Sequence, residues 1–350
     1  MKLLILNYSM NESSLLFSHQ RVVAQRLSEE FEETHVITAD EELGARTKGL
    51  YVTFTGWKPN KRLKSVIEFY KATVPLILKN RRSLVIFSHM TEVQSFLIAP
   101  WCRIFQIPHY LWYAHASRSF FLYGSYPFLN GIITSTPGSC PLKGKKVFPI
   151  GQAIDEQNLK GDFSKIKSPP LDWYHVGRID PSKKIDVIIT VFVRLRAMGW
   201  NLKLDIYGAP STEKSNNYLA LLLNKFQTEI TSNWLSFKGP IGRQQIFPIA
   251  NQHDGFVHAF QGSLDKAVLE ATLSKRIVAS INPEFIREFD SKEYLGGNLE
   301  EILFNQVSQF LNMTPTAIRS AIESNYEITK KNHTLERWLV ELCRILKNGK

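Results

Sequence analysis

The segment Trp173–Lys184, WYHVGRIDPSKK, decides the fold class. A short apolar run ends at Gly177, a polar and basic loop follows, and a helical pattern covers Ile185–Met198 directly afterwards. The same order returns at Leu202–Gly208 and at Trp234–Gly239, where each predicted strand again ends at a glycine. Repeated strand–helix units of this kind predict a parallel sheet that helices cover on both faces.

The rest of this half continues the pattern. A strand is predicted at Gly255–Val257, a helix at Ala267–Ser274 and a last strand at Ile277–Ser280. Ligands of open α/β sheets bind outside the carboxyl ends of the strands, where glycine lets the backbone approach closely. We therefore expect a ligand site at this edge of the sheet.

The first half of the chain shows the same alternation. Helices are predicted at Ser14–Phe31 and Lys61–Lys79. Strands are predicted at Lys2–Asn7, His35–Thr38, Tyr51–Thr55, Leu84–Ser88, Tyr110–Tyr113 and Ile132–Ser135. The sequence thus predicts an α/β protein with two Rossmann-like, doubly wound domains that face each other across a cleft.

A polar stretch that ends in two prolines, DEQNLKGDFSKIKSPP, separates the two halves. We expect an N-terminal domain over 1–155, a linker over 156–170 and a second, C-terminal domain over 171–325. A C-terminal helix over 326–350 is expected to cross back to the first domain.

Composition bounds the class of protein. The 350 residues are 44% hydrophobic and 21% charged, which is typical of a globular chain and excludes a disordered one. Three widely spaced cysteines indicate reduced packing residues, and neither a signal peptide nor a membrane-spanning run is recognisable, so we expect a cytoplasmic protein. The net charge of +11 attracts nucleic acid, anionic lipid or an anionic substrate without choosing between them.

The loop in VGRIDPSKK carries two basic residues, Arg178 and Lys183, between a strand and a helix. Two cations beside the positive end of a helix suit a pyrophosphate. A solvated basic turn would give the same spacing, and pattern alone leaves both interpretations open.

A second candidate segment is GSLDKAVLEA, Gly262–Ala271. The first turn of its predicted helix, about Ser263–Lys266, could present backbone N–H groups and the Lys266 ammonium to a phosphate. Glu270 lies further along the helix, where a carboxylate can accept hydrogen bonds from both hydroxyls of a ribose. An ordinary surface glutamate and a solvated lysine are the alternatives.

In the first half, His115 follows a predicted strand and can face the cleft, although a lone histidine is more often structural. Arg118 could bind an anion nearby or be exposed. The loop Asn11–Ser14 lacks the dinucleotide-binding glycine fingerprint, and no Asp-x-Asp pair occurs in the chain, so we predict no metal ion.

Taken together, these segments resemble a known family. VGRIDPSKK, followed by YG, FKGPI and GSLDKAVLEA, is similar in order and spacing to the C-terminal domain of family 4 glycosyltransferases of the GT-B fold. FSHQRVVAQRLSE, LWYAHAS and VFPIGQAID resemble the family's first βαβ unit, its strand-then-histidine element and its hinge segment.

The resemblance implies a role for individual residues. Arg178 and Lys183 match the pair that binds the donor's diphosphate, Glu270 matches the ribose ligand, and His115 matches the histidine that approaches the transferred sugar. The catalytic candidates are therefore His115, Arg178 and Lys183, with no metal ligand. The substrate-binding candidates are Glu270, Gly262, Ser263, Leu264, Asp265, Lys266, Gly177, Ser13 and Ser14.

Two positions depart from the family pattern. Gly262 stands where the family commonly has a glutamate that contacts sugar hydroxyls, although a subset has a Gly-Ser-Leu-Asp-Lys form like this chain. Ser13 and Ser14 replace a glycine pair after the first strand. Both changes leave the sugar and base of the donor open.

The segment 58–82 is strongly basic. It holds eight lysines and arginines against one acid, Glu68, with Trp57, Phe69 and Tyr70 nearby. A basic amphipathic helix with aromatic residues can lie on an anionic membrane surface, and a solvated helix face is the alternative. Nucleic-acid binding is not expected, because no recognition motif accompanies the charge.

We therefore expect a retaining, metal-independent glycosyltransferase that moves a sugar from a UDP- or GDP-sugar to an acceptor hydroxyl. The acceptor would be a glycan or a lipid-linked molecule in surface polysaccharide or glycolipid synthesis, and the protein would be peripheral on the inner face of the plasma membrane. No cofactor beyond the donor is expected. A non-catalytic nucleotide-sugar-binding relative and a sugar-nucleotide epimerase of the same fold are the alternatives.

Overall fold

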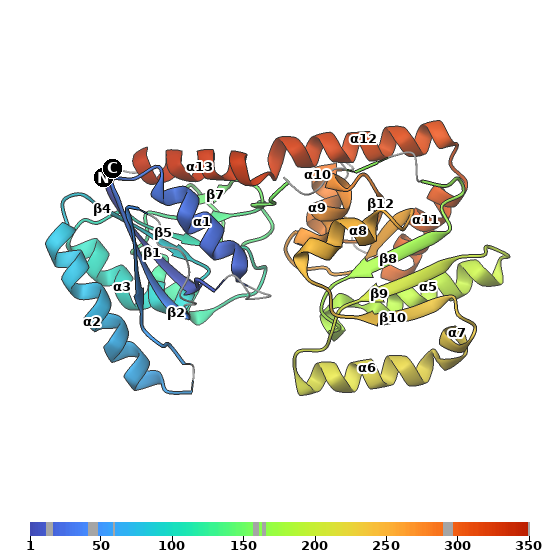
Figure 1. Ribbon diagram of the computed structural model, residues 1–350, viewed down its shortest axis with the longest axis horizontal. Coiled ribbons are helices and arrows are strands. Elements are labelled where there is room, and N and C mark those ends of the chain that lie inside the picture. Colours follow the sequence, from blue (N-terminus) through green and yellow to red (C-terminus); the bar gives the residue numbers. More distant parts are fainter. Residues whose placement is uncertain are drawn as a thin grey trace. The chain divides into compact units, whose positions relative to one another are not determined.

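The computed structural model describes residues 1–11, 17–40, 48–58, 60–156, 161–162, 166–289 and 297–348. Its contacts divide the chain into two compact units, coloured from blue to red along the sequence in Figure 1. Unit 1 comprises Met1–Gly151 together with Glu336–Lys350, and unit 2 comprises Gln152–Leu335. The candidate residues Ser13 and Ser14 lie outside the described residues.

Unit 1 is built on a parallel sheet with the strand order β3-β2-β1-β4-β5-β6-β7. The strands are β1 (Lys2–Ser9), β2 (Glu33–Asp40), β3 (Leu50–Phe54), β4 (Leu84–His89), β5 (His109–Trp112), β6 (Gly131–Thr134) and β7 (Val147–Pro149). Its helices are α1 (Ser18–Ser28), α2 (Arg62–Asn80), α3 (Glu92–Ile104), α4 (Phe120–Ser125) and α13 (Leu335–Asn348).

Helices cover both faces of this sheet because successive strand residues point to opposite sides. Ile86 of β4 packs with Phe69 of α2 and Ile98 of α3 on one face. Its neighbour Phe87 lies against Trp338 of α13, with 6.3 Å between ring centroids. Both side chains are fully buried, which explains why the strand reads as a continuous apolar run.

The last helix, α13, is fastened to unit 1 by packing and by ion pairs. The indole of Trp338 lies edge-on to Trp112, with centroids 5.2 Å apart. Arg26 of α1 donates two hydrogen bonds of 2.7 Å to the Glu336 carboxylate. The helix predicted over 326–350 is in fact two helices, because α12 ends at Asn332 and α13 begins at Leu335.

The break between these helices is used for hydrogen bonding within unit 2. The N–H of Ile154 donates to the carbonyl of His333, and the N–H of Leu335 donates to the carbonyl of Ile154. The N–H of Gln152 donates to Nδ1 of His333, whose Nε2 lies 2.8 Å from the Glu288 carboxylate. The two points where the chain passes between the units are therefore joined to each other.

Unit 2 holds a second parallel sheet, ordered β10-β9-β8-β11-β12. The strands are β8 (Asp172–Val176), β9 (Lys203–Tyr207), β10 (Leu235–Gly239), β11 (Gly255–His258) and β12 (Ile277–Ser280). The helices are η2 (Pro181–Lys183), α5 (Ile185–Ala197), α6 (Glu213–Lys225), α7 (Gln227–Thr231), η3 (Arg243–Gln245), α8 (Ile246–Ala250), α9 (Lys266–Leu273), α10 (Pro283–Phe289), α11 (Leu299–Leu311) and α12 (Pro315–Asn332).

The prediction of two parallel α/β domains is confirmed, with local differences. The boundary between the units falls at Gly151 and Gln152 rather than within 156–170. The described part of 156–170 is held to unit 2, since the backbone N–H of Lys167 donates to the Asp254 carboxylate. The short elements α4, β7 and α10 were not predicted, because three to seven residues carry too little periodicity.

The chain's cysteines, Cys102, Cys140 and Cys343, are all buried and free of disulfides. None of the helices in the described ranges combines the length and the apolar character that crossing a membrane requires.

The packing of α13 generates a stability prediction. Replacing Trp338, which is 1% exposed, by alanine should lower the free energy of unfolding by about 3–5 kcal/mol because the indole leaves a cavity. The matched change Val340→Ala on the same helix should cost less than about 0.5 kcal/mol, since Val340 is 66% exposed. Denaturant unfolding measures both variants, and equal losses would contradict the docking of α13.

Candidate functional site

The candidate site lies at the carboxyl ends of the strands of unit 2. From β8 the chain adds β9 and β10 on one side and then β11 and β12 on the other, so the strand order reverses between β8 and β11. Ligands of doubly wound sheets bind at this switch point. The loops that follow β8 and β11 carry most of the residues predicted from the sequence.

The loop after β8 approaches the neighbouring strand end very closely. The N–H of Gly177 donates to the carbonyl of Tyr207, at the end of β9. A Cβ atom on Gly208 would lie 1.8 Å from the Gly177 carbonyl oxygen, and Gly208 has a φ of 149°. Only glycine fits there, so this pair of glycines brings the two loops together.

Beyond Gly177, the loop turns into η2 and then α5. Asp180 caps η2 by accepting hydrogen bonds from the backbone N–H and the hydroxyl of Ser182. Lys184 adopts a left-handed conformation, with φ of 50°, immediately before α5 begins at Ile185. This turn leaves Arg178 exposed and buries Lys183, so the two predicted diphosphate ligands lie in different environments.

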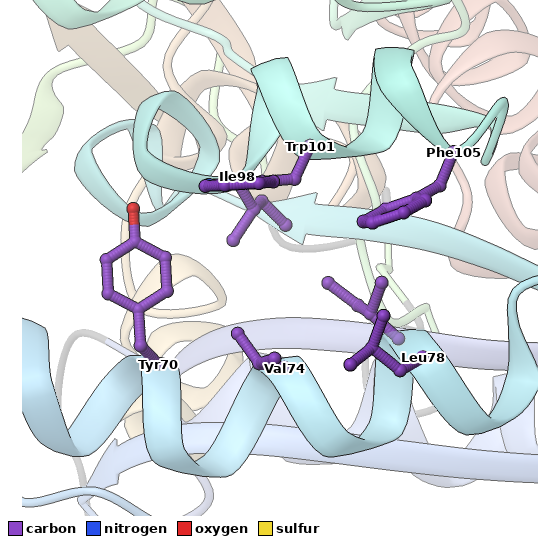
Figure 2. Close-up of a pocket in the computed structure, with 7 residues that line it drawn as sticks. Tyr70, Val74, Leu78, Ile98, Trp101 and Phe105 are labelled. Atoms are coloured by element: carbon purple, nitrogen blue, oxygen red, sulfur yellow. The ribbon is translucent and has the colours of Figure 1, made fainter.

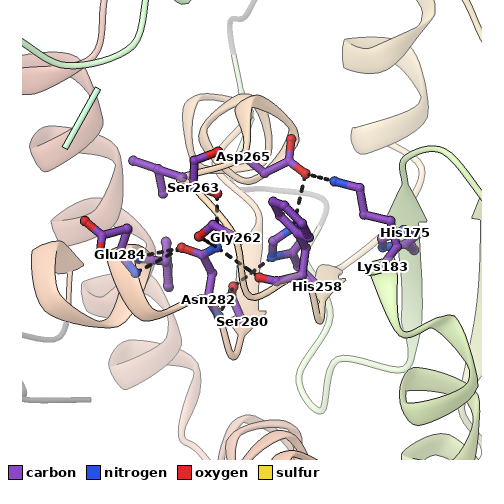
Figure 3. Close-up of polar contacts among 12 residues, drawn as sticks. His175, Lys183, His258, Gly262, Ser263, Asp265, Ser280, Asn282 and Glu284 are labelled. Carbon is purple, nitrogen blue, oxygen red and sulfur yellow. Dashed lines mark hydrogen bonds and ion pairs between the residues drawn. The ribbon is translucent and has the colours of Figure 1, made fainter. Parts of the chain in front are cut away.

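Lys183 and Asp265 form an ion pair that joins the loops after β8 and β11 (Figure 3). The residue Lys183 is only 8% exposed. Burial of Asp265 opposes its ionisation, but the Lys183 charge and a hydrogen bond from His258 hold the pKa of the Asp265 carboxyl well below its usual range. Asp265 is therefore an anion, and it neutralises the cation that the sequence assigns to the donor's diphosphate.

His258 supports the Asp265 carboxylate from the other side. Its Nε2 lies 3.4 Å from the carboxylate, and its Nδ1 lies 3.0 Å from the Ser280 hydroxyl. Complete burial lowers the pKa of His258, so the ring is neutral. Because an ionised carboxylate only accepts hydrogen bonds, Nε2 carries the proton and Nδ1 accepts from Ser280.

Phe260 lies at the centre of the site and was not predicted from the sequence. The Lys183 ammonium lies 4.0 Å from its ring centroid, as in a cation–π contact. A Cβ atom on Gly262 would lie 2.0 Å from Cζ of the same ring. The ring thus occupies the space that a side chain at position 262 would need, which accounts physically for the glycine there.

Asn282 fixes the shape of the loop that carries Phe260. Its Nδ2 lies within 3.2 Å of the carbonyl oxygens of Phe260, Gly262 and Ser263. Its Oδ1 accepts hydrogen bonds from the backbone N–H groups of Glu284 and Phe285, at the start of α10. Sequence reasoning missed Asn282, because the backbone carbonyls that tie it to the Phe260 loop lie about 20 residues away.

Glu270 of α9 is buried near two cations. It is 7% exposed, and its carboxylate makes no hydrogen bond to any residue within the described ranges. Burial raises its pKa to about 7, against the lowering influence of Arg243 and Lys266. Burial, with repulsion from Arg243, in turn lowers the pKa of Lys266 to about 8. A carboxylate and two cations thus meet at one end of α9.

The predicted start of this helix needs correction. The helix predicted at Ala267–Ser274 agrees with α9, which begins at Lys266 with Asp265 as its N-cap residue, but the first turn expected at about Ser263–Lys266 is wrong. Ser263 and Leu264 belong to the preceding loop, where the Leu264 carbonyl accepts a hydrogen bond from the Gln152 side chain. The Asn282 side chain binds the Ser263 carbonyl in this loop, and nothing in the local sequence pattern shows this contact.

The remaining predicted residues lie in unit 1. His115 follows β5, as expected, and is exposed, with its ring centroid 5.6 Å from that of Tyr113. Arg118 is exposed in the same loop. Within the described residues, no group of three or more His, Cys, Asp and Glu side chains could hold a metal ion.

No protein-family model matches the sequence, and no curated protein matches it either. Solved structures do match it along their whole length. HepE from Anabaena in complex with UDP has a TM-score of 0.72 at 14% identity, covering 99% of this chain and 100% of that chain.

Two further structures are similar to this chain. Sucrose-phosphate synthase from Thermosynechococcus elongatus has a TM-score of 0.77 at 10% identity, and a glycosyltransferase from Rickettsia africae has 0.72 at 11%. Each match covers 99% of this chain and 98% of the other. These likenesses confirm the predicted fold class, with two Rossmann-like domains of the GT-B type.

The buried Glu270 carboxyl generates a prediction about pH. An acid whose pKa is raised by folding stabilises the fold below its unfolded pKa, and this contribution is lost as pH rises through the folded pKa. For a rise from 4.5 to about 7, the loss is about 3 kcal/mol. Glu270→Gln should therefore be more stable than the wild type by about 2–3 kcal/mol at pH 8 and nearly equal to it at pH 4.5.

Urea unfolding across this pH range measures the difference. The control is Glu213→Gln, at an exposed position of α6, which should follow the wild type. Wild-type and Glu270→Gln curves that run parallel from pH 4.5 to 8 would show that Glu270 does not hold a proton in the folded state.

Proposed function

We propose that the protein is a glycosyltransferase with a UDP- or GDP-sugar as its donor. The observation that carries this proposal is the buried Glu270 carboxylate at the switch point of unit 2, which has no hydrogen-bond partner among the described residues and lies near cations. A nucleoside diphosphate is complementary to it, because ribose hydroxyls donate to a carboxylate and phosphate oxygens accept from cations. The structural neighbour HepE has been solved with UDP and with UDP-glucose.

In this proposal the residues of the site divide into those that bind the ribose and those that bind the diphosphate. Glu270 accepts hydrogen bonds from the ribose, and Lys183 and Arg178 bind the diphosphate. Beside the diphosphate lie Lys266, the N-terminal end of α9 and the segment Gly262–Asp265. Gly177 allows the nucleotide to approach the backbone closely. Lys183 must then leave Asp265 or share its ammonium group between Asp265 and the phosphate. The family 4 assignment rests on the matching motifs.

The reaction we propose retains the anomeric configuration. The acceptor hydroxyl attacks the anomeric carbon on the face from which the diphosphate departs, and its proton passes to a phosphate oxygen of the leaving group. The bond from the anomeric carbon to the diphosphate breaks as the bond to the acceptor oxygen forms. Lys183 and Arg178 stabilise the charge that grows on the diphosphate, so fixed cations can support a metal-independent reaction. His115 is proposed to approach the transferred sugar.

One observation favours a second candidate, a non-catalytic nucleotide-sugar-binding protein. The Phe260 ring fills the space beside Gly262, where the family commonly has a sugar-contacting glutamate. A site with Phe260 there keeps the nucleotide contacts and loses a polar contact to the sugar. In the transferase proposal, the same ring forms an apolar wall against one face of the sugar.

The acceptor we propose is a glycan or lipid-linked molecule of surface polysaccharide or glycolipid synthesis, at the inner face of the plasma membrane. The basic segment 58–82 supports this location, since lysines near an anionic surface each contribute about 1 kcal/mol of attraction.

The decisive experiment incubates the protein with a panel of UDP- and GDP-sugars, with and without a membrane extract, and measures nucleotide release. Release that depends on the extract, with sugar incorporated into extract material, is the expected result. Binding without any turnover would overturn the transferase in favour of the binding protein. Interconversion of the donor sugar without an acceptor would identify an epimerase instead.

The Lys183 assignment predicts a loss of turnover. Lys183→Gln should lower kcat/KM about 10- to 100-fold, the size of one charged hydrogen bond, and most of the loss should be in kcat because leaving-group charge grows in the transition state. Lys203→Gln is the matched control, since Lys203 is exposed at the opposite, amino-terminal end of β9. An unchanged kcat in Lys183→Gln would place the diphosphate elsewhere.

A further inference from the structure

A cavity of about 450 Å³ lies between α2 and α3 of unit 1. Figure 2 shows Tyr70, Val74 and Leu78 of α2 opposite Ile98, Trp101 and Phe105 of the α3 segment. We call this cavity the α2–α3 pocket. Its walls are aliphatic and aromatic, and they carry two polar side-chain atoms. The Tyr70 hydroxyl already donates to the Leu97 carbonyl at 2.9 Å, and the indole N–H of Trp101 is the other.

This chemistry selects the kind of ligand. Pockets for polar small molecules combine apolar walls with a few polar groups that orient the ligand. The lining of the α2–α3 pocket has no charged side chain and offers the Trp101 N–H as a single uncommitted donor, which is too little to orient a sugar, a nucleotide or a charged metabolite. A hydrocarbon chain is the ligand that its lining fits.

The pocket continues into an exposed apolar surface. Leu63, Ile67, Tyr70, Val74 and Leu78 follow one another at helical spacing and form an apolar stripe along α2. Leu63 is 76% exposed and Leu78 is 51% exposed. Trp101 and Ile104 of α3 are also exposed. Contiguous exposed apolar surface of this kind marks a site of interaction with a membrane or another protein.

A second stripe beside the first supplies the charge. Lys64, Lys71 and Lys79 each follow a member of the apolar stripe by one residue, so they form a parallel basic stripe on α2. It contains one acid, Glu68, which pairs with Lys71. Arg62, Arg81 and Arg82 add charge at the two ends of the helix. An apolar stripe next to a basic stripe is the arrangement of helices that lie in an anionic membrane interface.

We propose that the α2–α3 pocket binds one acyl chain of an anionic phospholipid while the basic stripe contacts the phosphates of the same bilayer. Charge favours this occupant over a second copy of the chain, which would bring the same lysines against one another. The proposal goes beyond sugar transfer, and it holds whether or not the transferase is confirmed.

The first test is flotation with phosphatidylglycerol–phosphatidylcholine vesicles at low salt. The wild type should bind, and it should not bind vesicles of phosphatidylcholine alone. Leu78→Gln keeps the net charge but should weaken binding roughly five- to tenfold, because a leucine side chain no longer enters the apolar phase. Leu221→Gln on α6, 67% exposed, is the matched control and should bind like the wild type.

The second arm tests the charge. Lys64→Gln with Lys79→Gln should weaken binding roughly 25-fold at low salt, a factor of five for each lysine, and should reduce its salt dependence. Lys203→Gln with Lys214→Gln, at exposed positions of unit 2, makes the same change in net charge and should leave binding intact.

The third arm tests whether the acyl chain enters the α2–α3 pocket. Vesicles with brominated acyl chains should quench tryptophan fluorescence in the wild type, and most of that quenching should disappear in Trp101→Phe. Absence of vesicle binding at low salt would overturn the proposal. So would binding that Leu78→Gln does not weaken, or quenching that Trp101→Phe does not reduce, since the pocket would then be unused. A dimer in light scattering that Leu78→Gln dissociates would assign the surface to a second copy and also overturn it.

Discussion

The arrangement of the candidate site depends on one buried charge, the ammonium group of Lys183. Burying a cation costs several kcal/mol unless an anion and hydrogen bonds compensate it. Asp265 provides the anion, and the face of Phe260 covers the ammonium group. Asp265 is held in turn by His258, and the loop that carries Phe260 is held by Asn282. A single charge thus ties together the segments that follow β8, β11 and β12.

Unlike Lys183, the Glu270 carboxylate has no hydrogen-bond partner within the described protein, and this difference identifies the site. Lys183 has its counter-ion within the protein, whereas the Glu270 carboxylate is buried with a raised pKa and has no hydrogen-bond partner among the described residues. Burial of such a group lowers stability, and raised pKa values of this kind gather at functional sites. A ligand that donates to Glu270 and brings phosphates to Lys183 would satisfy both. A nucleoside diphosphate does so, and it is the ligand on which the proposed function rests.

The fold could be predicted from sequence because the apolar runs of LLIL in β1 and WYHV in β8 end at polar or glycine-containing loops and alternate with helical patterns. The cations and the glutamate of the site could be singled out as residue types next to strand ends. The contacts of these residues could not be predicted. The Lys183–Asp265 pair and the contact of Asn282 with the Phe260 loop each join residues about 20 to 80 positions apart in the chain. The role of Phe260 also could not be predicted, since nothing in the sequence shows that its ring fills the space at Gly262. The start of α9 was misplaced for the same reason.

In the proposed function, nucleotide binding exchanges the partner of Lys183 and supplies a hydrogen-bond donor to Glu270. The most direct measurement is a crystal structure of the protein with UDP, read at these two side chains. The account predicts a phosphate oxygen within hydrogen-bond distance of the Lys183 ammonium and ribose hydroxyls on the Glu270 carboxylate. A nucleotide bound elsewhere, with the Lys183–Asp265 pair unchanged and Glu270 still without a partner, would contradict it.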